Sequence, residues 1–373
     1  MAKSKKAHQV INEKSLEFLK IYINTPSPVG SETAGQKLWL NYIKNYVDTT
    51  FTDVYGTAVG VINPVKPFKV VIEDHADEIR WFVNCISAEG FIYLKRNGGV
   101  DHQIAPSQRV TIHAKKGPVK AVFGWPAIHT RLSNNDNKEQ QPKVENLFLD
   151  CGARNKKEAE DLGIHVGAVV TYAEGFDELS YGNFIGRAFD NRIGGFMIAE
   201  VARFLKENKK TLPYALYIVN AVQEEIGLRG AEMIARKIKP DIAVITDVTH
   251  DSTTPMINKM IEGDCSCGKG PALVYGPAVH NKLLGLIQKV AEKNKIPFQL
   301  RAVSRSTGTD TDSFAYANDG CPSALISIPL RYMHTTVEML HRDDINNTIR
   351  LMYESVLALT PKTNLSYFLP EKV

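Results

Sequence analysis

The chain has 373 residues and carries 45 Lys and Arg against 41 Asp and Glu, which leaves a formal net charge of +4 at pH 7. Its hydrophobic share of 43% and charged share of 23% are typical of a globular protein, and at about 150 residues per domain its length predicts two domains. The small charge excludes the basic surplus of a nucleic-acid-binding protein. The chain has no run of about 18 apolar residues, so we expect no membrane span. The five scattered cysteines do not make a disulfide framework.

The N-terminal part predicts helices followed by strands. Residues 3–6 are basic, but the segment after them is too polar for a signal peptide, so we expect a cytoplasmic protein. Apolar residues recur at helical spacing over 16–23 and again over 39–47. Two short strands are then expected over residues 59–62 and 68–73.

The middle of the chain changes to a β-rich texture. Short runs of strand-forming residues appear at 81–83, 91–94, 110–113 and 119–123, separated by Gly, Pro and Asn. This pattern predicts a small all-β module, an insertion over about residues 78–177. Within it, residues 129–143 are rich in Asn and Gln and predict an exposed loop.

From Arg192 onward the chain alternates between strands and helices. Strands are expected over 214–222, 242–246, 299–303 and 324–328, each next to a segment with a helical period. Such alternation favours a mostly parallel sheet flanked by helices on both faces. We therefore expect an α/β catalytic domain formed by residues 1–77 and 178–373, interrupted by the β-rich insertion at 78–177.

Residues of the types that can bind metals lie at or after the expected strand ends, where α/β proteins place their reactive groups. Each of these residues alone is a weak signal, because a lone His is usually structural and an Asp after a strand usually caps a helix. Together they form a cluster of carboxylates and histidines. Clustered carboxylates repel one another and raise one another's pKa unless a cation is present. The set comprises His75, Asp77, Asp190, Glu224, Glu225, Asp247 and His334.

Imidazole and carboxylate ligands without Cys suit Zn²⁺, Co²⁺ or Mn²⁺. Two His and three carboxylates are too many for one four-coordinate ion that keeps a water, and they suit two ions that share an Asp. Such pairs of ions occur in aminopeptidases and other hydrolases.

The chain resembles the tetrahedral aminopeptidases, metallopeptidase family forty-two. These are dinuclear enzymes that include glutamyl and deblocking aminopeptidases and proteins labelled cellulase M. The resemblance covers nearly the whole chain. The matching segments are residues 26–32 (PSPVGSE), 75–79 (HADEI), 186–192 (GRAFDNR), 222–227 (VQEEIG), 247–249 (DVT), 308–310 (GTD) and 331–338 (RYMHTTVE).

The resemblance implies a role for each ligand-type residue. Asp190 would bridge two divalent ions, His75 and Asp247 would complete one site, and Glu225 and His334 would complete the other.

Two further residues would take part in catalysis. Glu224 would be the general base toward a water held between the ions, and Asp77 would orient His75. We expect adjacent Glu224 and Glu225 to point apart, because neighbours on an extended backbone point to opposite sides, provided that the strand ends there and the chain turns.

The resemblance also implies a partner and an assembly. The substrates would be short peptides, the insertion would be a β-barrel used for dimerisation, and dimers would assemble into a homododecamer. Three positions depart from the family pattern beside the first ligand: Glu73, Asp74 and Arg80.

Two alternatives stay open. A related dinuclear deacylase or amidohydrolase would share the Glu-Glu motif, and a non-catalytic assembly protein would keep the fold after losing a ligand. Three smaller features also stay open: Cys265 and Cys267 as a metal or redox pair, His250 as a neighbour of the site, and the loop with Thr309, Asp310 and Asp312. That loop lines the pocket or caps the following helix.

Overall fold

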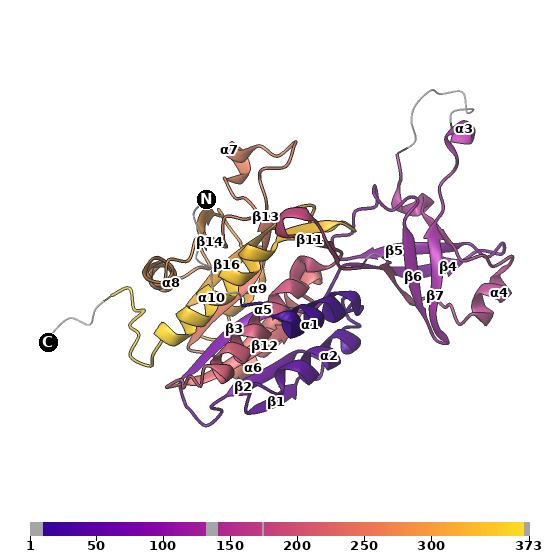
Figure 1. Ribbon diagram of the computed structural model, residues 1–373. Coiled ribbons are helices and arrows are strands. Elements are labelled where there is room, and N and C mark those ends of the chain that lie inside the picture. The colour runs from indigo at the N-terminus through magenta and orange to yellow at the C-terminus, as the bar shows by residue number, and fades with distance from the viewer. Residues whose placement is uncertain (1–9, 132–140, 174, 369–373) are drawn as a thin grey trace.

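The computed structural model describes residues 10–131, 141–173 and 175–368, which form an α/β body and a β-barrel that projects from it (Figure 1). The basic residues 3–6 and most of the predicted loop 129–143 lie outside the described residues. The start of that loop forms the short helix α3 (Ile128–Arg131). Within the described part of the chain, no helix combines the length and the apolar character needed to cross a membrane.

The α/β body is built on one eight-stranded sheet with the order β1-β2-β12-β3-β13-β16-β14-β15. Its central strands β12, β3, β13 and β16 are parallel, whereas β2 joins β12 and β14 joins β16 in antiparallel fashion. The predicted α/β class with a mostly parallel sheet is confirmed. The strands are β1 (Thr49–Thr52), β2 (Ala58–Ile62), β3 (Lys69–His75), β12 (Ala215–Ala221), β13 (Ile242–His250), β14 (Ala272–Tyr275), β15 (Gln299–Ala302) and β16 (Ser323–Leu330).

Helices cover both faces of this sheet. Adjacent residues of β3 show this, because Asp74 lies beside Gly194 of α5 whereas Glu73 faces Asp310 of α9, and neighbouring residues of a strand point to opposite faces. Helices α1, α2 and α10 pack on α5, and α6 packs on α9. The helices of the body are α1 (Glu13–Asn24), α2 (Thr33–Ile43), α5 (Phe189–Glu207), α6 (Arg229–Ile238), α7 (Lys259–Glu262), α8 (Asn281–Lys293), α9 (Asp310–Ala315) and α10 (Arg342–Ala358).

The inserted segment is a closed barrel with the strand order β4-β5-β8-β7-β6-β9. It has its own apolar core, in which the buried rings of Trp81 and Phe123 meet edge to face. The barrel lies within the predicted insertion, and the boundaries at 77/78 and 177/178 stay a prediction. Its elements are β4 (Arg80–Ile86), β5 (Ile92–Asn97), β6 (Arg109–Ala114), β7 (Gly117–Phe123), η1 (Val144–Asn146), β8 (Phe148–Asp150), α4 (Lys156–Asp161) and β9 (Val169–Tyr172).

A small sheet returns the chain from the barrel to the body. Its order is β10-β11-β17, and the pairing of β11 with β17 sets Gly186 opposite Glu338. This sheet therefore joins the segment before α5 to the segment before α10. The elements are β10 (Asp177–Glu178), η2 (Ser180–Gly182), β11 (Asn183–Gly186) and β17 (Glu338–His341).

Candidate metal centre

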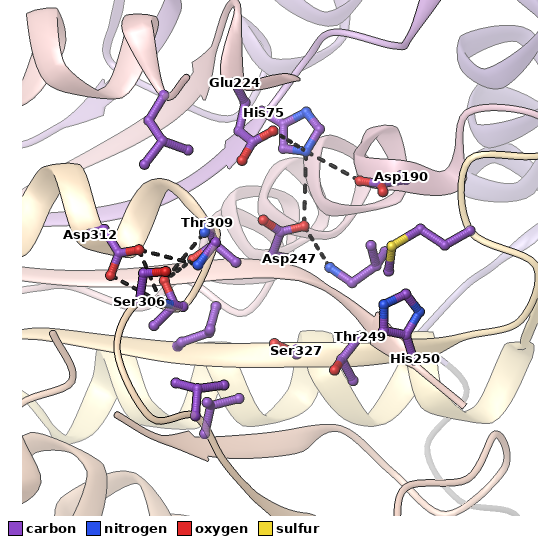
Figure 2. Close-up of a pocket in the computed structure, with 18 of the residues that line it drawn as sticks. His75, Asp190, Glu224, Asp247, Thr249, His250, Ser306, Thr309, Asp312 and Ser327 are labelled. Atoms are coloured by element: carbon purple, nitrogen blue, oxygen red, sulfur yellow. Dashed lines mark hydrogen bonds and ion pairs between the residues drawn. The ribbon is translucent and has the colours of Figure 1, made fainter. Parts of the chain in front are cut away.

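The predicted ligands meet at one edge of the sheet, and Figure 2 shows three of them, His75, Asp190 and Asp247. His75 is the last residue of β3, and the Glu-Glu pair follows β12 in the 3₁₀ helix η3 (Glu224–Ile226). Asp247 lies on β13, which continues to His250, so the predicted end of this strand at residue 246 is wrong. Since parallel strands present their carboxyl ends at the same edge, segments far apart in the sequence converge there.

Asp190 lies between the two histidines. Its Oδ1 is 3.3 Å from His75 Nε2, and its Oδ2 is 3.1 Å from His334 Nε2. One carboxylate thus presents each oxygen to a different imidazole, and its role as a bridging ligand stays a prediction.

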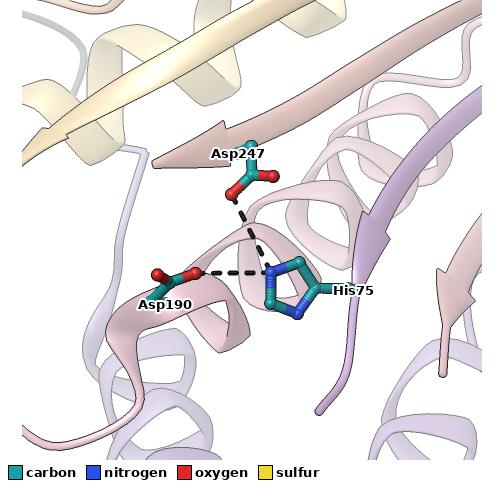
Figure 3. A group of neighbouring side chains, drawn as sticks. All are labelled: His75, Asp190 and Asp247. Atoms are coloured by element: carbon teal, nitrogen blue, oxygen red, sulfur yellow. Dashed lines mark ion pairs between the residues drawn. The ribbon is translucent and has the colours of Figure 1, made fainter. Parts of the chain in front are cut away.

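Two groups of side chains have the spacing needed to hold a metal ion. The first is His75, Asp190 and Asp247 (Figure 3), and the second is Asp190, Glu225 and His334; within each group the ligand atoms lie within 4.8 Å of one another. His75 Nε2 is 3.9 Å from Asp247 Oδ1, and His334 Nε2 is 3.3 Å from Glu225 Oε1. Asp190 belongs to both groups, as expected for two ions that share one carboxylate.

The electrostatics of the centre are consistent with a bound cation. Burial raises the pKa of Asp247 to about 7 and that of Glu224 to about 10, because a buried carboxylate is costly to ionise. Burial disfavours the imidazolium of His334, but its contacts with Asp190 and Glu225 outweigh burial and raise its pKa to about 11. A divalent ion would stabilise these carboxylates in their charged form and would favour neutral imidazoles, so the donor set fits the metals expected.

The carboxylate of Asp77 contacts the backbone of the Glu-Glu pair. Its carboxylate accepts hydrogen bonds from Glu224 N at 3.0 Å and from Glu225 N at 3.2 Å. The distance from Asp77 Oδ1 to His75 Nδ1 is 3.7 Å, longer than a hydrogen bond. The orienting role toward His75 stays a prediction, and the contacts that the structure contains couple the ends of β3 and β12.

Glu224 and Glu225 point to different parts of the centre, but not on an extended backbone. Gln223 has a left-handed conformation with φ 60°, and the pair then enters η3, so the chain turns there as expected, but the two residues are not extended. Glu224 Oε2 is 3.7 Å from His75 Nε2, whereas Glu225 faces His334. The turn separates the two carboxylates.

Glu338 supports the centre and was missed by sequence reasoning. It is buried at the start of β17, where its Oε1 accepts a hydrogen bond from His334 N at 2.8 Å and its Oε2 accepts one from Asp190 N at 3.0 Å. The sequence signals were its place four residues after His334 and its position at the end of the family segment 331–338. Its partner Asp190 is 148 residues away along the chain.

The residues that depart from the family pattern do not displace the ligands. Glu73 and Asp74 are buried in β3, and burial raises the pKa of both carboxyls well above the usual range. Arg80 begins β4, and its guanidinium donates a hydrogen bond to Ser31 Oγ at 3.1 Å. Glu73 and Asp74 therefore belong to the buried part of β3 before His75, and Arg80 belongs to the start of the barrel.

A cavity of about 600 Å³ opens beside the centre and is lined by His250, Thr309 and Asp312 among others. The side chain of Thr309 accepts a hydrogen bond from Thr311 N and caps α9, so this loop both caps the helix and lines the cavity, the two roles expected of it. Asp310 is buried and faces Glu73.

Cys265 and Cys267 belong to neither of the metal-ligand groups found among the described residues. The backbone of Cys265 pairs with Ser252, and Cys267 N donates a hydrogen bond to Asp251 Oδ2 at 2.7 Å. Burial raises the pKa of the Cys265 thiol to about 12, which does not favour a reactive thiolate.

Comparisons with known proteins agree with this geometry. The family model described as M42 glutamyl aminopeptidase matches residues 56–351. The chain is 32% identical over 348 residues to the lysyl aminopeptidase of Pyrococcus furiosus, a match that covers 92% of this chain and 97% of that protein.

Two solved structures share the whole architecture. The TET aminopeptidase of a marine-sediment Thaumarchaeota archaeon has a TM-score of 0.87 at 31% identity, covering 92% of this chain and 96% of that chain. The TET1 peptidase of Pyrococcus horikoshii has a TM-score of 0.80 at 25% identity, covering 92% and 99%. The chain therefore belongs to the M42 glutamyl aminopeptidase family and is an aminopeptidase, a hydrolase of peptide bonds.

Proposed function

We propose that this protein is a dinuclear metal-dependent aminopeptidase that removes N-terminal residues from short peptides. His75, Asp190 and Asp247 would hold one ion, and Asp190, Glu225 and His334 the other. The observation that carries the proposal is the position of Asp190, whose two oxygens face the two histidines. Zn²⁺, Co²⁺ and Mn²⁺ all suit these ligands.

Glu224 is proposed as the general base. When bound, two ions supply Lewis acidity toward a water and the scissile carbonyl. The carboxylate of Glu224 stands beside the first ligand group, 3.7 Å from His75 Nε2, and lines the cavity. From there it can accept a proton from the attacking water and deliver it to the leaving amine. Asp77 holds the backbone of Glu224 in place for this transfer.

The position of the proposed ions favours a substrate with a free α-amino group. Asp190, Glu225 and Asp247, which would hold the ions, line the cavity, so a free α-amino group in its neutral form would bind beside an ion. An acylated nitrogen has no lone pair available for this contact, which supports an exopeptidase over the related deacylase.

Assembly forms part of the proposal. The TET1 peptidase of Pyrococcus horikoshii can assemble into a tetrahedron or a large octahedral shell. We propose that this chain also forms a homo-oligomer, with dimers made through the barrel and twelve subunits in the complete particle.

The test is the release of amino acid from short peptides with free or acetylated N-termini, after the protein is loaded with Co²⁺ or Zn²⁺. We expect cleavage of the free forms only. Cleavage of acetylated forms would indicate the deacylase. E224Q is expected to keep both ions, measured by elemental analysis, and to lose several orders of magnitude in kcat.

A matched variant separates metal binding from proton transfer. D190A is expected to lose metal because both ligand groups contain Asp190. Two ions retained in D190A, or near-normal turnover in E224Q, would contradict the assignments.

A further inference from the structure

The inserted barrel contacts the second ligand group of the metal centre. The barrel projects from the α/β body (Figure 1), but the two residues that follow β5, Gly98 and Gly99, lie against the centre. Gly98 packs beside Glu225, and Gly99 packs beside His334. A module with its own core therefore meets two of the proposed metal ligands at one short loop.

The contact with His334 leaves no room for a side chain at position 99. A Cβ built on Gly99 would lie 2.5 Å from His334 Nδ1 and 2.7 Å from His334 Cε1, whereas heavy atoms that are not bonded pack at about 3.5–4.0 Å. The imidazole would therefore have to move by about 1 Å. Since binding groups must be held within about 0.5 Å of their working geometry, a methyl group at position 99 would disturb the ligand.

The backbone requires glycine at only one of these two positions. Gly98 has φ 80°, a left-handed conformation that favours glycine. Gly99 lies outside the left-handed region, so the turn itself does not demand a glycine there. The close approach of His334 explains why position 99 carries no side chain.

The imidazole of His334 lies between this loop and the carboxylates of the centre. Gly99 borders the edge of the ring formed by Nδ1 and Cε1. The Nε2 atom faces Asp190 Oδ2 at 3.1 Å and Glu225 Oε1 at 3.3 Å. Because the ring is rigid, a push at the first edge also moves Nε2 relative to these oxygens, and Nε2 is the atom that would bind the ion.

A second part of the barrel reaches the same place. Tyr172 of β9 and Ile79, which precedes β4, line a cavity of about 10 Å³ whose other walls include all three members of the second ligand group. Ile79 also packs on the glycine loop, because its Cγ2 lies 3.0 Å from a Cβ built on Gly98. The barrel thus forms a wall of the second ligand group.

We propose that the barrel completes the second metal site and that Gly99 is a positioning residue, whose missing side chain lets His334 reach the ion together with Asp190 and Glu225. This inference rests on the proposed two-ion centre. It gives the barrel a role in metal binding in addition to its proposed role in assembly.

The test is G99A, in which the metal-free protein is titrated with Co²⁺ and visible absorption reports the surroundings of each bound ion. The wild type is expected to bind two ions. G99A should bind the ion of His334 about 10- to 100-fold more weakly, the usual effect of disturbing a group that orients a ligand, and the absorption of that site should change. The ion of His75 and Asp247 should bind as in the wild type. Wild-type affinities and absorption in G99A would overturn the proposal.

The matched control is G124A, at the residue that follows β7. A Cβ on Gly124 would lie 2.3 Å from the ring of Phe148, so this variant introduces a comparable clash inside the barrel. Phe148 belongs to neither ligand group, and G124A should therefore bind both ions like the wild type. An equal loss of metal in G124A and G99A would assign the effect to the stability of the barrel and would contradict the positioning role.

A second variant keeps the test decisive if G99A does not fold. Val100 is buried in the barrel core and anchors the glycine loop, so V100A loosens the loop without adding an atom beside His334. We expect V100A to weaken the ion of His334. The control is V83A, which removes the same atoms from an equally buried valine of β4; equal metal affinities in the two variants would count against the proposal.

One further measurement separates this inference from the proposed function. If the wild type binds a single ion, the two-ion centre fails. Crystal structures of the metal-free wild type and G99A then still decide the role of Gly99. A His334 ring displaced by about 1 Å in G99A would support the role, and a ring in its wild-type position would overturn it.

Discussion

At the scale of single residues, the centre depends on a carboxylate outside the proposed ligand sets. Glu338 accepts hydrogen bonds from the backbone N–H groups of His334 and Asp190. Both residues belong to the second ligand group. Glu338 is thus a positioning residue, since it holds the backbone of two proposed metal ligands.

E338Q is expected to weaken metal binding about 10- to 100-fold, the usual effect of removing a group that holds ligands in place. The Gln amide has one oxygen, so its NH₂ must face one of the two N–H donors. Chelator competition measures the affinity, and thermal unfolding of the metal-free protein reports on stability alone.

The control for this variant is E232Q on the exposed face of α6, which should bind metal like the wild type. Unchanged metal affinity in E338Q would rule out the positioning role. A fall in thermal stability without a fall in metal affinity would assign Glu338 to packing.

At the scale of elements, the close approach of α6 to the end of β12 shapes the Glu-Glu turn. Gly230 N donates a hydrogen bond to Val222 O at 2.8 Å. A Cβ on Gly230 would lie 2.3 Å from that oxygen and 2.5 Å from Val222 N. Only glycine therefore permits this contact, and Glu224 follows two residues after Val222.

G230A is expected to lower the free energy of unfolding by about 1–3 kcal/mol, because the helix must move away from the strand end. Denaturant unfolding measures the change. The matched variant is G285A on α8, where an added Cβ meets nothing within 4 Å. G285A should instead be stabilised by about 0.5–1 kcal/mol through helix propensity; equal effects of the two variants would contradict the argument.

At the scale of the whole molecule, the barrel projects from the α/β body (Figure 1). It exposes apolar side chains of its own, among them Val166, with 66% of its surface accessible. Since the barrel is the proposed site of dimerisation, we expect the contact between subunits to cover Val166.

V166E is expected to reduce the size of the assembled particle, because a charge buried in a contact between subunits is costly. Sedimentation velocity measures the change. The control is V65E in the loop between β2 and β3 of the α/β body, where Val65 is 90% exposed. If V166E leaves the particle as large as V65E does, the contact lies elsewhere.

The alternating part of the fold was predictable because its signals are local. The helices α5 and α8 and the strands β12 and β16 follow from periodicity within short windows. Short elements escaped this reasoning. β14 has four residues and β17 has four, too few for a period, and their existence depends on the strands beside them.

The candidate site divides in the same way. The types of residue in the centre were evident, since His and carboxylates at strand ends indicate metal binding. The divergence of Glu224 and Glu225 was predictable, but their backbone conformation was not, because a left-handed Gln223 leads the chain into a 3₁₀ turn. That conformation depends on the contacts of Asp77 with the two N–H groups.

The sequence by itself therefore determined the α/β class, the inserted β-rich module and the set of candidate ligands, because each follows from residue types and spacings along the chain. Only the tertiary structure decided which oxygen of Asp190 faces which histidine, that Glu338 holds two ligands and that Gly99 of the barrel lies against His334. The physical reason is that these contacts join segments brought together by strand pairing and register. Hydrogen bonds and charges act through space, and distance along the chain does not predict them.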